Sequence, residues 1–414
     1  MPETNQLKNV WILNHYGQAP VDAGGTRHFH LAEYLLGHSW QVTIIAASFN
    51  HNTGCQRLAY HESSRNEYIE GVPFLWLRTP GYKGNGGKRI LNMLAYTWQV
   101  LKKTATEKLQ RPDVVVGSSV HPFAAVAAFF LSRRFNVPFV FEVRDLWPQT
   151  LVDLGRLKDN SFITWALRKM ESWLYLNASR IVVLLPFAWQ YIVPLGVSKE
   201  QIVWIPNGVD LSLFSLPSFS ARQPNDVFTL MYLGSHAQAD GIENMLRAMK
   251  IIKDRNDQLQ IKLRLVGDGP MKLKLVALAQ ELCLSNVSFE QPVAKNQIPA
   301  IAVQADAFIV VVLNFPKLYR YGISMNKLYD YLASARPIII VSNAANNPVV
   351  DADAGISVTT ANPEDLANAI VKMAEMSVEE REQMGRNGRH YVEQNHSFEM
   401  LSAKFAAVLD DVCR

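Results

Sequence analysis

A polar segment at residues 322–337 follows an apolar run at residues 308–313. Its side chains that could do chemistry are Ser324, Asn326, Lys327 and Asp330. The apolar run predicts a buried strand, and the polar segment predicts a loop and the first turn of a helix. A helix N-terminus attracts anions, Lys327 adds a charge suited to phosphate, and the carboxylate of Asp330 can accept hydrogen bonds from a pair of sugar hydroxyls. These features indicate a nucleotide-sugar site, although a serine-capped surface helix explains the same residues.

Two loops in the first half of the chain carry the candidate catalytic residues. His121 follows the apolar run 114–117, directly before a proline, and the pair Arg144–Asp145 follows the run 139–143. A histidine at the end of a strand can present its ring to a ligand, or it can cap or pack locally. The Arg–Asp pair can bind substrate hydroxyls, or it can form a structural ion pair. Both interpretations stay open for each loop.

Three glycines stand between a predicted strand and the following helix. They are Gly25, which is paired with Gly24, and then Gly234 and Gly267. Because glycine has no Cβ, the backbone can pass close to a bound group at such positions. We expect these loops to approach a phosphate, although a flexible turn between strand and helix has the same composition.

Short β-branched runs alternate with helical patterns along almost the whole chain. This alternation predicts two α/β domains, each a doubly wound parallel sheet, at residues 1–205 and 227–390. A segment rich in proline, serine and polar residues predicts a hinge and linker at 206–226. The last helix, at 391–414, is predicted to pack back toward the first domain. Since ligands bind at the carboxyl ends of parallel strands, we expect both domains to face one cleft.

The composition excludes several classes of protein. The 414 residues carry a net charge of only +4. This small charge argues against a protein that binds nucleic acid through a strongly positive surface. Three scattered cysteines fit a reducing compartment and give neither a disulfide framework nor a zinc spacing. The N-terminus has no secretory signal pattern, and no apolar run approaches the roughly 20 residues of a membrane span. We expect a cytoplasmic protein, either soluble or peripheral on the cytoplasmic face of the inner membrane.

Several tempting motifs are missing or misplaced. The chain has neither a P-loop motif nor a G-x-G-x-x-G motif opening a helix, which argues against a P-loop enzyme and an ordinary nicotinamide dehydrogenase. Asp351 and Asp353 follow a loop away from any strand end, where surface acids are common. His28 and His30 are two residues apart in a predicted helix, so they do not share a face. We predict no metal site.

The motifs together resemble a two-domain GT-B glycosyltransferase of the retaining glycosyltransferase family 4. The segments that carry the resemblance are Gly24–Gly25 and residues 141–148, 205–210, 267–270 and 324–337. They span essentially the whole chain in the expected order. Within the family, the chain is similar to the bacterial branch that builds surface polysaccharides such as O-antigen or capsule, including enzymes that transfer N-acetylfucosamine.

The resemblance implies a division of roles between the domains. The second domain would bind a nucleotide diphosphate sugar, UDP-linked, with Asp330 on the ribose and Gly234 and Lys327 near the diphosphate. The first domain would bind a lipid-linked glycan acceptor near Gly25, His121 and Arg144–Asp145. The transferred sugar would be an N-acetylated hexosamine or deoxyhexosamine, moved with retention and without a metal or other cofactor. The resemblance gives no oligomeric state.

Two positions depart from the family pattern. Family 4 enzymes commonly carry two glutamates with seven residues between them in the last motif, where this chain has Gly322 and Asp330. They also commonly place an arginine and a lysine after the strand equivalent to residues 229–233, where this chain has Ser235, His236 and Ala239. Lys327 is therefore expected to carry more of the diphosphate charge.

Two other functions remain open on the sequence. A nucleotide-sugar epimerase shares the two-domain architecture, but it needs an acid and a base at the sugar ring, and the hinge sequence 205–210 favours transfer. A non-catalytic nucleotide-sugar-binding scaffold would have kept the fold and lost the carboxylate at Gly322. Transfer or hydrolysis of the donor in vitro separates these classes.

A basic segment at residues 81–111 contains seven lysine and arginine residues against one acid, Glu107. Within it, Ile90, Leu94, Trp98 and Leu101 recur at helical spacing. Such a helix either turns its apolar side to the core and its basic side to solvent, or it docks on an anionic membrane that carries the acceptor.

Overall fold

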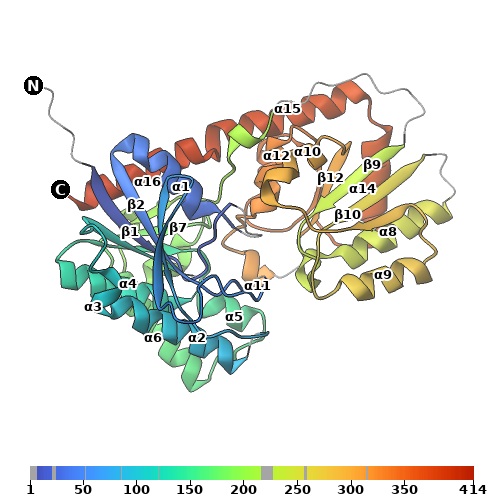
Figure 1. Ribbon diagram of the computed structural model, residues 1–414. Helices are drawn as coiled ribbons and strands as arrows, with labels where there is room; N and C mark the ends of the chain where they lie inside the picture. Colours follow the sequence, from blue (N-terminus) through green and yellow to red (C-terminus); the bar gives the residue numbers. More distant parts are fainter. Residues whose placement is uncertain are drawn as a thin grey trace, which may run out of the picture. The chain divides into compact units, whose positions relative to one another are not determined.

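The computed structural model describes residues 7–20, 25–51, 53–84, 86–119, 121–215, 227–255, 259–313 and 316–414. The chain divides into two compact units, each built on its own sheet (Figure 1). Unit 1 comprises Met1–Pro206 and Phe398–Arg414, and unit 2 comprises Asn207–Ser397. The sequence placed the end of the second domain at 390, but helix α15 (Val378–Asn395) runs through that position without a break. Residues 216–226 of the predicted linker lie outside the described residues.

Unit 1 contains an 8-stranded sheet in the order β3-β4-β2-β1-β5-β6-β7-β8. Its strands are β1 (Lys8–Leu13), β2 (Trp40–Ala47), β3 (Ser64–Ile69), β4 (Val72–Leu77), β5 (Val114–Ser119), β6 (Phe139–Val143), β7 (Arg180–Val183) and β8 (Ile202–Trp204). The pairs are parallel except for the edge pair β3 with β4. The central strands are apolar runs buried on both faces, as a sheet covered by helices on each side requires.

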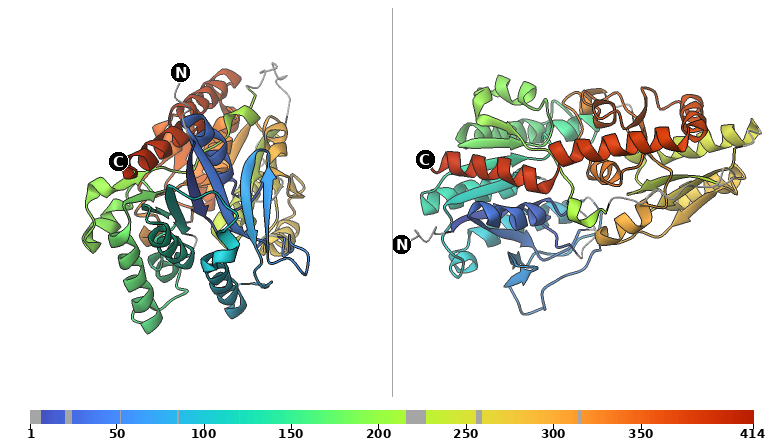
Figure 2. Two further views of the ribbon diagram at one scale, coloured as in Figure 1. Left: turned by 60° about the vertical axis from the view of Figure 1, so that its left-hand side comes forward. Right: turned by 90° about the horizontal axis from the view of Figure 1, so that it is seen from above.

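Two sets of helices cover the sheet of unit 1 (Figure 2). Helices α1 (Arg27–Leu35) and α16 (Phe398–Val412) pack on one face and share an apolar core with β1 and β2. On the other face lie α2 (Gly87–Leu101), α4 (Pro122–Phe135) and α6 (Phe162–Asn177). The ring of Trp11 on β1 meets Phe135 of α4 at 5.1 Å between centroids. The last helix of the chain therefore belongs to unit 1.

Unit 2 contains a 6-stranded sheet in the order β11-β10-β9-β12-β13-β14. Its strands are β9 (Phe228–Leu233), β10 (Ile261–Val266), β11 (Val287–Glu290), β12 (Ala307–Val311), β13 (Ile338–Val341) and β14 (Gly355–Val358). All its pairs are parallel. Its main helices are α8 (Ile242–Asp254), α9 (Lys272–Glu281), α12 (Asn326–Ala333), α14 (Pro363–Glu375) and α15.

Alternation along β9 shows how the sheet of unit 2 is covered on both faces. Leu230 and Tyr232 belong to the core beneath α8 and α14, whereas Met231 and Leu233 belong to the core beneath α12 and α15. Successive side chains of a strand point to opposite faces, so an apolar run without polar interruptions fills both cores. The predicted pair of doubly wound parallel-sheet domains is confirmed.

Candidate active site

The loops after β9 and β10 touch each other through backbone atoms. Gly234 and Gly267 have φ angles of 156° and 148°. A Cβ added to Gly267 would lie 1.8 Å from the carbonyl oxygen of Gly234, so no side chain fits there. Both predicted glycines therefore stand together at the carboxyl edge of the sheet, where their loops can approach a ligand closely.

Lys327 lies beside this pair of loops. Its ammonium donates to the hydroxyl of Tyr232 at 2.6 Å and to a carboxylate oxygen of Asp240. A Cβ added to Gly234 would lie 3.2 Å from the Lys327 nitrogen. Helix α12 thus brings Lys327 beside the glycine loops, and its ammonium is already bound by Tyr232 and Asp240. The sequence analysis did not identify Asp240 or Tyr232, which lie 87 and 95 residues before Lys327.

Asp330 is one turn further along α12 and is buried. Both of its carboxylate oxygens accept hydrogen bonds from the ammonium of Lys295, one of them at 2.6 Å. Lys295 is a second basic residue that the sequence analysis did not identify. Asp330 is therefore part of a lysine–carboxylate pair, and a hydroxyl that binds it would share the carboxylate with Lys295.

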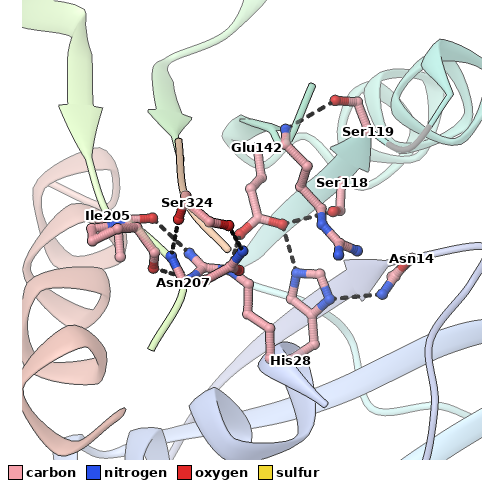
Figure 3. A network of polar contacts seen from close by, with 11 residues as sticks. Asn14, His28, Ser118, Ser119, Glu142, Ile205, Asn207 and Ser324 are labelled. Atoms are coloured by element: carbon pink, nitrogen blue, oxygen red, sulfur yellow. Dashed lines mark hydrogen bonds and ion pairs between the residues drawn. The ribbon is translucent and has the colours of Figure 1, made fainter. Parts of the chain in front are cut away.

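The other two residues of the α12 segment are placed differently. Ser324 contacts Asn207: its hydroxyl accepts the backbone N–H of Asn207 at 2.9 Å, and its carbonyl accepts the side-chain amide at 2.7 Å (Figure 3). Ser324 therefore fixes the start of unit 2. Asn326 is half-buried and is the first residue of α12.

His236 follows Gly234 in the loop after β9 and lies against the loop after β10. Its backbone N–H donates to the carbonyl of Asp268 at 2.8 Å, and a Cβ on Gly269 would lie 2.6 Å from the His236 carbonyl oxygen. The side chain is buried, and neither ring nitrogen has a hydrogen-bond partner within the described ranges. Burial, assisted by Lys272, lowers the pKa of this imidazole. An orphaned polar ring here is suited to bonding a ligand group.

In unit 1, a buried cluster organises the residues after β1, β5 and β6 (Figure 3). Glu142 of β6 accepts hydrogen bonds from the guanidinium of Arg27 at 2.9 Å, the ring of His28 at 2.6 Å and the hydroxyl of Ser118 at 2.6 Å. Arg27 also donates to the carbonyl of Ile205 at 3.0 Å. The network ties the N-terminus of α1 to β5, β6 and the segment after β8.

The tautomer of His28 follows from its two contacts. The amide of Asn14 donates to Nδ1 at 2.8 Å, which leaves the Nε2–H to donate to Glu142. Burial raises the pKa of Glu142, but the hydrogen bond from His28 and the charge of Arg27 outweigh burial and hold this pKa well below its ordinary value. Burial lowers the pKa of His28 despite the nearby charge of Glu142. The cluster therefore holds an ionised carboxylate beside a neutral imidazole at neutral pH.

Gly25 directly precedes this cluster. It is half-buried and stands two residues before the first residue of α1, Arg27. Because Arg27 and His28 are fixed by Glu142, the backbone at Gly25 is held at the carboxyl end of the sheet. Its neighbour Gly24 lies outside the described residues.

His121 is fully buried among aromatic rings. Its ring lies 4.7 Å from that of His15 and 5.9 Å from that of Tyr16, between centroids. Neither of its ring nitrogens has a hydrogen-bond partner in the part of the chain that the structure describes. Burial holds its pKa well below the ordinary value and lowers the pKa of His15 to about 3. His121 is therefore neutral near pH 7, and a neutral imidazole can accept a proton or donate a hydrogen bond.

Arg144 and Asp145 follow β6 but do not pair with each other. Arg144 is half-buried, and its backbone N–H donates to the hydroxyl of Ser119 at 3.2 Å. Asp145 is exposed. Among the described residues no ion pair joins the two side chains, although the charge of Arg144 acts on the carboxyl group of Asp145. The structural ion-pair interpretation is therefore left without a direct contact to support it. A role in binding substrate hydroxyls stays a prediction.

We expect stability to fall as the pH drops below about 6.5, because the buried histidines 15, 28, 121 and 236 all have lowered pKa values. Unfolded histidines take up protons near pH 6.5, whereas the folded ones do not. Each histidine therefore removes about 1.4 kcal/mol of unfolding free energy per pH unit until its folded pKa is reached. Urea midpoints should stay level from pH 7.5 to about pH 6.5 and then decline toward pH 5.5.

The control for this experiment is His61, which is exposed. His61→Gln should leave the pH dependence of the urea midpoint unchanged, whereas His121→Gln should reduce its slope. A midpoint that stays constant down to pH 5.5 would show that these histidines are not held neutral by the fold.

Two family models match the chain, one in each unit. The glycosyl transferase 4-like domain matches residues 23–208, and the glycosyl transferases group 1 model matches residues 227–376. The first match covers the strands of unit 1 except β1, and the second covers every strand of unit 2. The chain belongs to the GT-B glycosyltransferases of the family 4 type.

Relatives in sequence and in structure agree with this assignment. "Probable glycosyltransferase WbjE" of Pseudomonas aeruginosa is 24% identical over 319 residues, which cover 73% of this chain and 75% of the relative. WcaI of Escherichia coli K12, a glycosyl transferase named for colanic acid biosynthesis, is 21% identical over 295 residues, covering 68% and 71%. The solved structure of Anabaena HepE in complex with UDP-glucose is 14% identical, with a TM-score of 0.65, covering 98% of this chain and 99% of that one. The predicted GT-B fold is confirmed.

Proposed function

We propose that this glycosyltransferase moves a sugar from a UDP-sugar to a growing lipid-linked glycan during the synthesis of a bacterial surface polysaccharide. The observation that carries the proposal is the position of Lys327, fixed by Asp240 and Tyr232 beside the glycine loops of unit 2. WcaI is named for colanic acid biosynthesis, which supports a polysaccharide product, and the UDP-glucose complex of HepE supports a UDP donor. The sugar proposed is an N-acetylated hexosamine or deoxyhexosamine.

The chemistry proposed for unit 2 is stabilisation of a leaving diphosphate. The bond between the anomeric carbon and the diphosphate oxygen breaks, and its electron pair stays on the diphosphate. Lys327 and the backbone N–H groups of the strand-end loops stabilise the charge that develops there. Asp330, shared with Lys295, binds the ribose hydroxyls, and the orphaned ring of His236 bonds a phosphate oxygen or the sugar.

Unit 1 is proposed to hold the acceptor near Gly25, His121 and Arg144–Asp145. The acceptor hydroxyl forms the new bond on the face from which the diphosphate leaves, so configuration is retained, and its proton passes to the leaving diphosphate. No carboxylate nucleophile is assigned, unlike in retaining glycosidases, where a second carboxylate forms a covalent intermediate. His121 is the side chain proposed to bond an acceptor hydroxyl, because its neutral ring has no hydrogen-bond partner among the described residues.

The test is a panel of nucleotide sugars incubated with the purified chain and a lipid-linked acceptor. Release of free nucleotide together with a lengthened glycan supports transfer, and we expect it with a UDP-linked N-acetylated sugar. Release of an epimerised sugar without glycan growth would support the epimerase. Binding of the donor without any turnover would support the non-catalytic scaffold.

We further expect transfer to continue in excess EDTA, because Lys327 and the loop N–H groups supply the positive charge at the diphosphate. Initial rates with and without the chelator should agree within about twofold, the scatter we allow for the assay. The matched control is an added excess of Mg²⁺ or Mn²⁺, which should not raise the rate. Complete loss in EDTA, restored by either ion, would contradict the proposed metal-free mechanism.

A further inference from the structure

The apolar stripe of helix α2 faces outward. The side chains of Ile90, Leu91, Leu94 and Trp98 are exposed by 53%, 58%, 46% and 63%. The opposite side of the helix, which includes Met93 and Tyr96, is buried. The interpretation of α2 as a helix that turns Ile90, Leu94 and Trp98 to the core is therefore wrong. Large apolar residues recurring at helical spacing on an exposed face need a partner.

Polar residues explain why α2 is turned this way round. Asn92 is buried and donates to the hydroxyl of Thr79 at 2.9 Å, and Tyr96 donates from its hydroxyl to the carbonyl of Ile45 on β2 at 2.6 Å. Tyr96 attaches the inner side of the helix to the sheet, and Asn92 attaches it to the loop that follows β4. The more apolar side of α2 is thereby left at the surface of unit 1.

Helix α6 carries a second exposed apolar group. The side chains of Phe162, Ile163 and Trp165 are exposed by 77%, 60% and 56%, and the rings of Phe162 and Trp165 stack at 5.6 Å between centroids. Helix α4 contacts both α2 and α6 and lies between them in the left view of Figure 2. Phe130 of α4 is also 50% exposed. The three helices therefore form one layer, here called the outer helical face, with aromatic residues on each helix.

Positive charge accompanies these apolar groups. Exposed lysines and arginines on or beside the three helices are Lys83, Lys88, Lys103, Lys108, Arg133, Arg134 and Lys169. The ammonium of Lys102 lies 3.6 Å from the ring centroid of Trp98. Among the acids nearby, Glu107 is exposed, Asp159 is paired with Arg168, and burial raises the pKa of Glu171 to about 8. The outer helical face is thus both apolar and cationic.

We propose that the outer helical face of unit 1 docks on the surface of an anionic lipid bilayer. Trp98, Phe162 and Trp165 lie at the level of the acyl chains, and the lysines lie over the lipid phosphates, as in other interfacial helices. Lysine is depleted in protein–protein interfaces, so the charge complementarity favours lipid over a protein partner. Among the described residues no helix is long and apolar enough to cross a membrane. The purpose of docking, access to a lipid-linked acceptor, rests on the proposed function.

Sedimentation with vesicles tests this proposal without any turnover. The wild-type chain should sediment with vesicles of phosphatidylcholine and phosphatidylglycerol, and much less with phosphatidylcholine alone. The apolar variant Leu91→Ser/Leu94→Ser/Trp98→Ser should bind at least about tenfold more weakly, because each exposed side chain loses its burial in lipid. All three positions are at the surface, so the variant should keep the fold, which circular dichroism and thermal melting check.

The charge variant Lys88→Gln/Lys102→Gln/Lys103→Gln separates charge from apolar insertion. Three lysines near an anionic surface account for about a 100-fold change in affinity at low salt, and the difference should vanish at high salt. The matched control is Tyr60→Ser/Leu273→Ser, which removes two apolar side chains that are 98% and 86% exposed elsewhere. It should sediment like the wild type.

Three outcomes would overturn the proposal. The wild type fails to sediment with anionic vesicles, or the apolar variant sediments as the wild type does, or the chain forms a dimer in solution that the apolar variant loses. The last result would assign the outer helical face to a second copy. Transfer to a soluble acceptor analogue should be equal in all variants, so failure of transfer with intact vesicle binding would reject the proposed function and leave the docking in place.

Discussion

Lys327→Met should lower kcat/KM for sugar transfer by about 10²–10³-fold, the loss expected when a preorganised charge is removed from a leaving group. Methionine keeps the length of the side chain and most of its packing, so the change isolates the charge. Nucleotide affinity, measured by calorimetric titration, should fall as well, because the diphosphate is already charged before transfer. Helix α12 should remain folded, since its core contacts come from other residues such as Leu328 and Leu332.

The control for this experiment concerns Asp240, which loses its lysine in the single variant. A half-buried carboxylate left without its partner could disturb the loop by itself. The double variant Lys327→Met/Asp240→Asn removes both charges and restores neutrality. If the lysine acts on the diphosphate, the double variant stays as slow as the single one. Recovery to near wild-type kcat/KM would show that Lys327 only neutralises Asp240.

Glu142→Ala should lower the free energy of unfolding of unit 1 by about 3–5 kcal/mol, because it leaves the buried guanidinium of Arg27 without its carboxylate. The same change removes the partner of the Nε2–H of His28. The loop before α1, including Gly25, should then lose its fixed position. Hydrogen exchange followed by mass spectrometry measures the effect within unit 1, where α1 and β5 should exchange faster.

Ser118→Ala is the matched control for Glu142, since it removes one neutral donor from the same carboxylate. Its expected cost is about 1 kcal/mol. Exchange in unit 2 should not change in either variant, because all members of the cluster belong to unit 1. Equal protection of α1 in Glu142→Ala and wild type would show that the buried network does not stabilise this unit.

The sequence predicted the fold and the edges of the sheets where ligands bind. Apolar runs alternating with helical patterns predict a parallel sheet covered by helices on both faces. Glycines directly after such runs indicate the carboxyl edge of that sheet. Gly234 and Gly267 could therefore be placed without coordinates. The backbone contact between the two loops that carry these glycines could not be predicted, because it depends on the register of β9 against β10.

The hydrogen-bond partners of the charged residues could not be predicted from the sequence. Asp240 and Lys295 are separated from Lys327 and Asp330 by 87 and 35 residues, and nothing in their local sequence distinguishes them from surface residues. The orientation of α2 could not be predicted either, because its periodicity predicts an amphipathic helix but does not show which side faces the sheet. That choice depends on the hydrogen bonds of Asn92 and Tyr96, which form only in the folded unit.

The return of α16 to unit 1 means that the proposed acceptor half is not encoded by one continuous stretch of the gene. Phe405 and Leu409 of this helix are buried in the core that covers β1 and β2, and Asp410 binds Lys8 at 2.8 Å. A nonsense mutation in the last few dozen codons would therefore expose the core of the half encoded first. An isolated acceptor half would have to be expressed with residues 398–414 supplied as a fused or separate peptide, whereas residues 207–397 can be excised as one block.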